Sequence, residues 1–97
     1  MVVEIDAELE SLIPRFLENR HKDVQALSAA LGSGDFPLII TVGHNMKGAG
    51  GGFGFHEISQ IGARIETAGR AASVTAVKDC LATYQSYLAG LEVVFIR

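Results

Sequence analysis

The sequence has little cysteine, no basic cluster and no long apolar run, and each shortage excludes a class of protein. Cys80 is the only cysteine, which excludes an internal disulfide and favours a reducing compartment. The net charge is −3 and no basic or basic–aromatic stripe occurs, so nucleic acid is not expected as a partner. The longest aliphatic stretch, Leu38 to Val42, is far shorter than the ~20 residues of a membrane span.

The sequence also lacks targeting, nucleotide-binding and metal-binding motifs. The first residues, Met1 to Asp6, have neither the basic start nor the apolar run of a signal peptide, so we expect a cytoplasmic protein without a membrane partner. Lys47 precedes the glycine-rich run instead of following it, and no strand leads into that run, so a phosphate-binding loop is not indicated. No HExxH motif or Cys/His spacing is present, and we expect neither a metal nor another cofactor.

What the sequence does have is helical periodicity along nearly its whole length. A chain of 97 residues, 48% of them hydrophobic, is expected to form one globular domain over residues 1–97. Apolar positions recur at helical spacing over residues 16–31, 38–53, 58–72 and 74–91. Short connections between these segments predict an all-α fold, an antiparallel up-down four-helix bundle with a short extra N-terminal helix.

Capping and breaking residues mark the ends of these helices. Asp6 is a candidate N-cap of the short first helix, and Pro14 either begins a new helix or kinks this one. The segment 32–34 ends the first long helix, and Asp35 and Ser73 are candidate N-caps further on. The tail over residues 93–96 either extends the last helix or leaves it, and the pattern does not decide between the two.

One helix has a face that an ordinary solvated helix would not have. With about 100° per residue, Gly48 and Gly51 fall within roughly 40° of His44, Gly52 lies somewhat further round, and Lys47 borders the same side. Glycine inside a helix costs about 1 kcal/mol relative to alanine, so several glycines need a reason. Bare backbone beside His44 allows another protein to approach the imidazole closely. Histidine is a competent nucleophile near neutral pH, and the Lys47 ammonium can pair with a phosphoryl group on it.

This segment resembles the signature of histidine-phosphotransfer (HPt) domains. Its order of residues is most similar to that of the phospho-accepting domain of chemotaxis histidine kinases. The signature positions are filled in order by His44, Lys47, Gly48, Ala49, Gly50, Phe53 and Gly54. The glycines at 51 and 52 depart from the family, in which other small residues are commoner at these places. The resemblance implies an antiparallel four-helix bundle and phosphorylation of His44 on Nε2.

The resemblance also implies the partners and the type of chemistry. A histidine kinase or a phosphorylated receiver would supply the phosphoryl group, and a response-regulator receiver domain would exchange it with His44. The chain would be a phosphoryl carrier of a two-component phosphorelay rather than a stand-alone enzyme, because it has no ATP site of its own. The Mg²⁺ ion and the attacking aspartate would belong to the receiver.

Glu66 is a candidate supporting residue for His44. If the turn between the two helices is centred near residue 55, antiparallel pairing places Glu66 level with His44. Chemotaxis-type domains carry a glutamate at the matching place. A carboxylate that accepts the Nδ1–H would fix the tautomer that leaves Nε2 free to attack. The alternative is a glutamate at the edge of the core that merely solvates its helix.

For the other conspicuous residues, a structural or surface role is the simpler interpretation. His21 lies in a run of charged residues, which indicates a solvated helix face. His56 is expected near the start of a helix. Structural packing is the expected role of three further side chains, Cys80, Phe53 and Phe55. Arg64 and Arg70 are surface charges that would help to attract an acidic receiver pocket if they lie on the His44 side. The alternative for the whole chain is a non-catalytic helical adaptor or a dimerisation bundle, whereas a carrier is expected to be a monomer.

Overall fold

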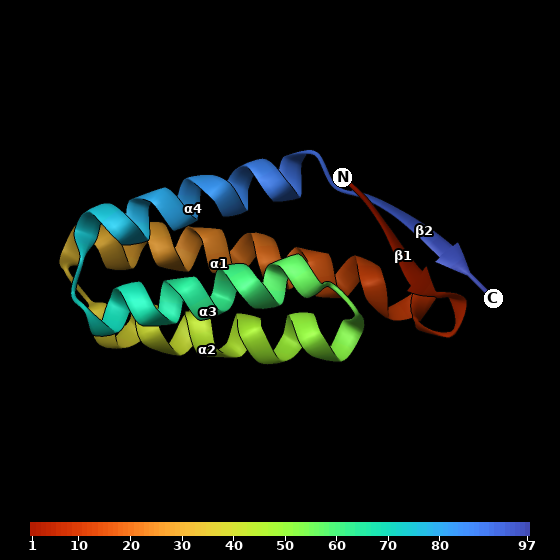
Figure 1. Cartoon of the computed structure of the whole chain (residues 1–97), viewed down its shortest axis with the longest axis horizontal. Helices are drawn as coiled ribbons and strands as arrows, with labels where there is room; N and C mark the ends of the chain where they lie inside the picture. The colour runs from red at the N-terminus through yellow and green to blue at the C-terminus, as the bar shows by residue number, and fades with distance from the viewer.

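Four long helices form most of the structure, which is a computed structural model that describes all residues from Met1 to Arg97. In chain order they are α1 (Ile13–Ser33), α2 (Phe36–Phe53), α3 (His56–Arg70) and α4 (Val74–Ala89). Figure 1 shows them side by side, with the turns that join successive helices at alternate ends of the molecule. The mostly helical chain and the helical bundle agree with the prediction. None of the helices combines the length and apolarity that crossing a bilayer requires.

The predicted caps are found at the helix ends. The Asp35 carboxylate accepts a hydrogen bond from the backbone N–H of Leu38 at 3.1 Å, at the start of α2. Ser73 Oγ accepts one from the N–H of Ala76 at 3.2 Å, at the start of α4. Gly34 and Gly54 end α1 and α2 with φ of 68° and 87°, the left-handed conformation that glycine adopts without a steric penalty.

The predicted short N-terminal helix is a 3₁₀ helix, η1 (Ala7–Leu12). Asp6 caps it, because its carboxylate accepts a hydrogen bond from the N–H of Glu8 at 2.8 Å. Pro14 occupies the first turn of α1, where its missing N–H leaves no bond unmade. Of the two roles considered for Pro14, it therefore begins a new helix.

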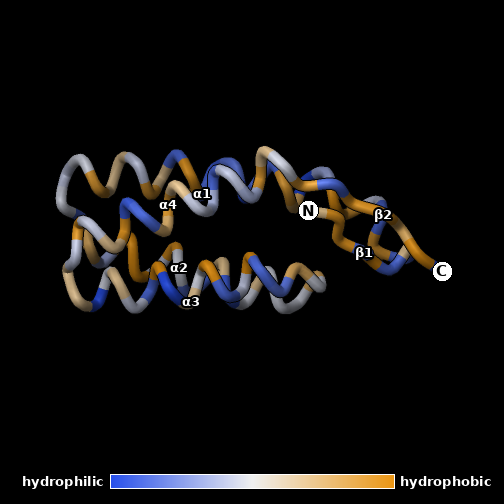
Figure 2. The backbone as a smooth tube through the Cα atoms, turned by 45° about the horizontal axis from the view of Figure 1, so that its top comes forward, coloured by the Kyte–Doolittle hydropathy of each residue, from blue (hydrophilic) through white to orange (hydrophobic).

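The prediction of an all-α chain is wrong at both ends. Strands β1 (Val2–Asp6) and β2 (Glu92–Ile96) pair in parallel, with Val3 opposite Val93 and Ile5 opposite Phe95. These four apolar side chains turn inward and alternate with exposed neighbours, which is the two-residue period of a strand. The C-terminal tail therefore leaves the last helix, and Figure 2 shows β1 and β2 running beside each other beyond the end of the bundle.

The core runs along the inside of the four helices. Its fully buried side chains include Leu27, Ile39, Met46, Ile58, Ile65 and Tyr84. At one end, the Phe16 ring of α1 lies 4.6 Å from the Phe53 ring and 5.0 Å from the Phe55 ring, between ring centroids. These contacts join α1 to the turn between α2 and α3, and they show that Phe53 and Phe55 pack at this helix junction.

Helices α2 and α3 approach each other so closely that their contact requires glycine. A Cβ atom on Gly43 would lie 2.6 Å from the backbone nitrogen of Glu66, and one on Gly62 would lie 2.6 Å from that of Lys47. Gly50 meets Ser59 in the same way, at 2.6 Å from its backbone nitrogen. Backbone atoms cannot give way as a flexible side chain can, so these three glycines fix the distance between the two helices.

Candidate functional site

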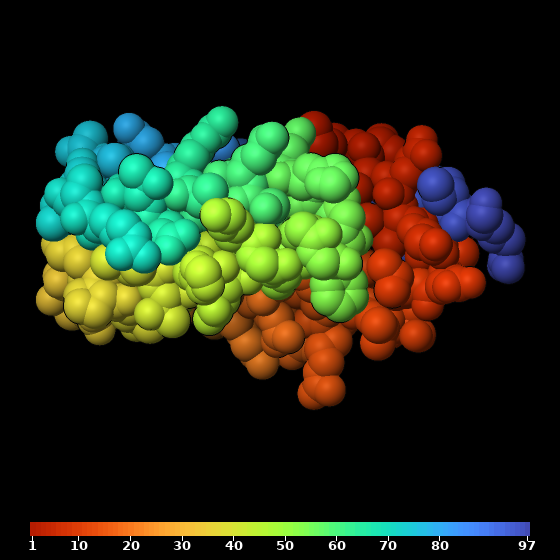
Figure 3. Space-filling view, turned by 60° about the horizontal axis from the view of Figure 1, so that its bottom comes forward, coloured from red at the N-terminus to blue at the C-terminus, as the bar shows by residue number.

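His44 lies in the middle of α2, on the surface, beside the contact with α3. Its side chain is 71% exposed. Its neighbour Gly43 is buried against α3, and one residue further turns the helix by about 100°, which brings His44 to the edge of the contact. Figure 3 shows α2 and α3 forming one continuous face of the molecule. The imidazole is therefore held at a rigid helix pair and remains open to solvent.

The structure brings Glu66 to His44, at the level that antiparallel pairing indicates. His44 Nδ1 lies 3.4 Å from Glu66 Oε2, and the Glu66 side chain is only 15% exposed. The same Oε2 accepts a hydrogen bond from Arg70 Nη2 at 3.0 Å. The Arg70 hydrogen bond holds the pKa of the Glu66 carboxyl below its ordinary value, and the charge of His44 acts in the same direction.

Lys47 and several open glycines follow His44 along α2. Lys47 is exposed and forms no salt bridge within the chain. A Cβ atom on Gly48 or Gly52 would have no neighbour within 4 Å, and one on Gly51 would meet only Ser59 Oγ at 3.9 Å. The side chain of Ser59 also donates a hydrogen bond to the carbonyl of Lys47 at 2.9 Å, which ties this turn of α2 to α3. The part of α2 that follows His44 thus combines open glycine backbone with the Lys47 ammonium, which has no salt bridge.

The other two histidines lie elsewhere and have no such surroundings. His21 is exposed on α1, and His56 is the exposed first residue of α3. Neither forms a salt bridge with a carboxylate, whereas His44 does. The chain has no group of three His, Cys, Asp or Glu side chains arranged to hold a metal ion.

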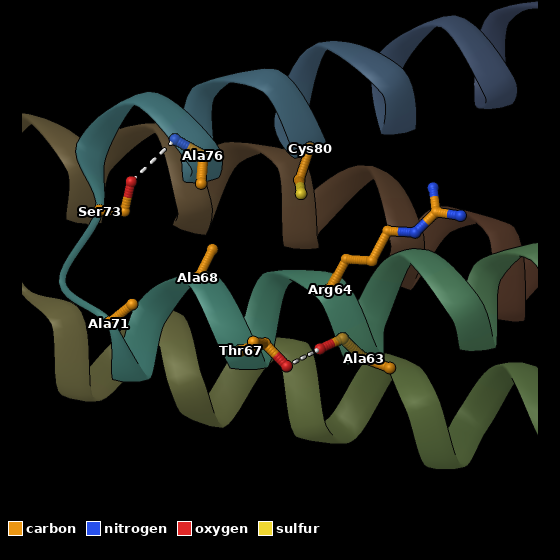
Figure 4. Close-up of a pocket in the computed structure, with 8 residues that line it drawn as sticks. All are labelled: Ala63, Arg64, Thr67, Ala68, Ala71, Ser73, Ala76 and Cys80. Carbon is orange, nitrogen blue, oxygen red and sulfur yellow. Dashed lines mark hydrogen bonds between the residues drawn. The ribbon is translucent and has the colours of Figure 1, made fainter.

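The hollows of the molecular surface are separate from His44. A groove of about 500 Å³ runs between α3 and α4, and Figure 4 shows Arg64 and Cys80 at its sides. Its walls consist largely of alanines, and they include none of His44, Lys47 and Glu66. Burial raises the pKa of the half-buried Cys80 thiol, in agreement with the packing role expected for it. The site around His44 is therefore exposed surface, and none of His44, Lys47 and Glu66 lines a pocket.

This arrangement suits transfer of a group between proteins. An Nδ1–H that faces a carboxylate leaves the Nε2 lone pair directed away from Glu66, and Nε2 takes part in no hydrogen bond or salt bridge of the structure. An exposed nucleophile beside open glycines can meet a reacting atom of another protein. Fold and site together define a class, a helical bundle that presents one exposed histidine beside a carboxylate.

The chain belongs to the Hpt domain family. The family model described as Hpt domain matches residues 11–93, which confirms the resemblance drawn from the His44 segment. Members of this family act in histidine phosphotransfer within two-component signalling, where they interact with kinases and response regulators. Comparison with curated proteins and with solved structures gave no significant match.

Two features of the site were missed from the sequence, although signals for both were present. Gly43 and Gly50 are seven residues apart, two helical turns, and so share one face of α2. That spacing indicates a close helix contact, separate from the open glycines. Arg70 stands four residues after Glu66, the spacing at which a glutamate and a following cation pair on a helix.

Proposed function

We propose that this domain carries a phosphoryl group on His44 Nε2, between a histidine kinase or a receiver aspartate and a response-regulator receiver domain. One observation carries the proposal. His44 is a 71% exposed histidine whose Nδ1 faces the Glu66 carboxylate while its Nε2 has no partner in the chain. Membership of the Hpt family supports the type of reaction. We place the carrier in a single domain, residues 1–97, folded as an antiparallel up-down bundle.

In the proposed step, the Nε2 lone pair attacks the phosphorus of a receiver acyl phosphate. A phosphorus–nitrogen bond forms, the bond from phosphorus to the aspartate oxygen breaks, and the aspartate leaves as a carboxylate. The imidazole keeps its Nδ1 proton, and the positive charge that develops on the ring is stabilised by Glu66. Reversal of the same steps passes the phosphoryl group to the next receiver. In this scheme catalysis is mainly positioning and charge stabilisation.

Lys47 and the open glycines have separate parts in the proposal. Lys47 lies one turn from His44, about 4.5 Å along the helix axis, and its ammonium is free to pair with the phosphoryl oxygens. Gly48, Gly51 and Gly52 give the partner access to the backbone of α2. The receiver brings the aspartate and the Mg²⁺ ion. We propose that the carrier works in the cytoplasm as a monomer, which a mass measurement in solution would check.

The proposal is tested by phosphoryl transfer to purified protein. Wild type, His44→Gln and His56→Gln would be incubated with a panel of phosphorylated receiver domains, and acid-labile phosphate would be followed on each. His56 is the matched control because it is also an exposed helical histidine. We expect wild type and His56→Gln to be labelled and His44→Gln to remain unlabelled. Labelling of folded His44→Gln, or failure of every receiver to label folded wild type, would overturn the proposal.

A further inference from the structure

Two groups contact the same oxygen atom of Glu66, and the contact from Arg70 is the shorter one. Arg70 Nη2 lies 3.0 Å from Oε2 and makes a hydrogen bond, whereas His44 Nδ1 lies 3.4 Å from the same atom. The longer contact exceeds the usual N–H···O hydrogen-bond length of about 2.7–3.2 Å, so it is an electrostatic contact and not a hydrogen bond of the structure. The position of the Glu66 carboxylate is therefore determined by Arg70 first and by His44 second.

The Glu66 side chain needs such a restraint because the close contact between α2 and α3 limits the conformations in which the side chain reaches His44. The backbones of α2 and α3 touch at Gly43, where a Cβ would lie 2.6 Å from the Glu66 nitrogen. A side chain of three rotatable bonds must run along the edge of this contact to reach the imidazole, and fixing those bonds costs conformational entropy. Arg70 follows Glu66 by one turn on the same helix, so α3 itself supplies the partner that selects this conformation.

A purely structural role for Arg70 also exists and makes different predictions. Arg70 is the last residue of α3, where a positive charge stabilises the helix dipole. Its side chain is 66% exposed, so it could equally attract an acidic partner from solution. Neither role would change which of the two ring nitrogens of neutral His44 carries the proton. A restraint acting through Glu66 would change it.

We propose that Arg70 is a positioning residue for His44, which acts by holding the Glu66 carboxylate against Nδ1 and so favours the tautomer with Nε2 unprotonated. This inference rests on the proposed function only for its consequence, a faster phosphoryl transfer. The positioning itself is a property of the unphosphorylated protein. It assigns a role in the reaction to a residue outside the His44 segment, on the neighbouring helix.

The first test is a spectroscopic one on the unphosphorylated full chain. The ¹⁵N chemical shifts of the His44 ring nitrogens report the tautomer, and they would be measured for wild type, Arg70→Ala, Arg70→Lys and Arg64→Ala. Arg64 is the matched control, an exposed arginine of α3 without a salt bridge. We expect Arg70→Ala to lose Nδ1–H tautomer, Arg70→Lys to recover part of it and Arg64→Ala to match wild type. Equal tautomer fractions in wild type and folded Arg70→Ala would overturn the inference.

The second test measures the consequence with phosphoramidate, a small phosphodonor that needs no docking face. Nε2 attacks the phosphorus of the donor, whose nitrogen is protonated as –NH3⁺. A bond from phosphorus to Nε2 forms, the phosphorus–nitrogen bond of the donor breaks, ammonia leaves and the ring keeps its Nδ1 proton. We expect Arg70→Ala to be phosphorylated about two- to fivefold more slowly than wild type and Arg64→Ala. Equal rates in the two arginine variants would contradict the inference. If wild type were not labelled, the proposed function would fail, and the tautomer measurement would still decide the role of Arg70.

Discussion

At the scale of single residues, Glu66 links the site to the stability of the fold at low pH. Its pKa lies below the ordinary value of 4.5, because Arg70 and His44 both favour the carboxylate. Between the lowered pKa and the ordinary one, the unfolded chain binds more protons at this position than the native state does. Glu66 therefore adds stability that is fully present above its ordinary pKa and is lost as the pH falls through the lowered one.

We expect Glu66→Gln to remove this part of the acid sensitivity. Thermal melts from about pH 3 to about pH 7 would show a smaller loss of stability on acidification in the variant than in wild type. Glu10→Gln is the control, because Glu10 is exposed and has no salt bridge. Parallel curves for wild type and Glu66→Gln would show that the Arg70–Glu66–His44 contacts do not persist in solution.

Lys47 is expected to act on the phosphorylated state and not on folding. It is exposed and free of salt bridges, so Lys47→Ala removes a charge that no native contact uses. We expect transfer about two- to fivefold slower, or a correspondingly shorter phosphohistidine lifetime, with an unchanged melting temperature. Lys78→Ala, on α4, provides the comparison for a general loss of positive charge. An equal effect of Lys47→Ala and Lys78→Ala would show that Lys47 acts through long-range electrostatic attraction and not through contact with the phosphoryl group.

At the scale of elements, α2 contains glycines of two kinds, and alanine substitution separates them. Gly43 faces backbone atoms of α3, with a Cβ position 2.6 Å from the nitrogen of Glu66, whereas Gly48 faces open space. We expect Gly43→Ala to destabilise the fold by about 1–3 kcal/mol through overpacking. Gly48→Ala should instead stabilise it by about 0.5–1 kcal/mol, because alanine is the better helix former.

Chemical denaturation of the two variants and wild type would measure both effects. Each variant adds the same single methyl group to the same helix, so the pair serves as its own control. A stable Gly43→Ala protein would mean that α2 and α3 can move apart without cost. It would also remove the reason given for the rigid placement of Glu66 beside His44.

The helices could be predicted because their signals are local. Asp35, Ser73 and Gly34 act within one turn of their own positions, and the apolar stripes follow from spacing alone. Periodicity shows that a face is bare or apolar but does not show what lies opposite it. For this reason the spacing places Gly48, Gly51 and Gly52 on the His44 side, whereas the structure shows that Gly43 and Gly50 touch α3.

At the scale of the whole molecule, the pairing of β1 with β2 is a contact between distant segments that local sequence patterns do not predict. Val3 and Val93 pair across almost the full chain, and a parallel pair can form only after the four helices have brought the two ends together. The short alternations in β1 and β2 are visible in the sequence, but five residues at a terminus do not identify a partner so distant. The arrangement of Lys47 and the open glycines around His44, by contrast, could be predicted because these residues lie on one helix. The position of Glu66 could be predicted because only a short turn separates α3 from α2.

The docking face proposed around Gly48, Gly51 and Gly52 also belongs to the scale of the whole molecule, because it would act only when a second protein binds. Gly48→Leu should leave the bundle folded, since nothing lies within 4 Å of the Gly48 Cβ position and leucine suits a helix. We expect the bulky side chain to reduce transfer from a receiver domain at least about tenfold, the effect of roughly 1.4 kcal/mol of lost contact. Labelling by phosphoramidate, which needs no docking, should remain close to wild type.

The control for this experiment is Gly32→Leu, since Gly32 in α1 also has no neighbour within 4 Å of its Cβ position. We expect that variant to behave as wild type with both donors. A parallel loss with receiver and phosphoramidate in Gly48→Leu would mean that the leucine disturbs the imidazole itself. Full transfer from the receiver in Gly48→Leu would show that partners do not approach His44 across this glycine face, and the docking geometry proposed for the carrier would be wrong.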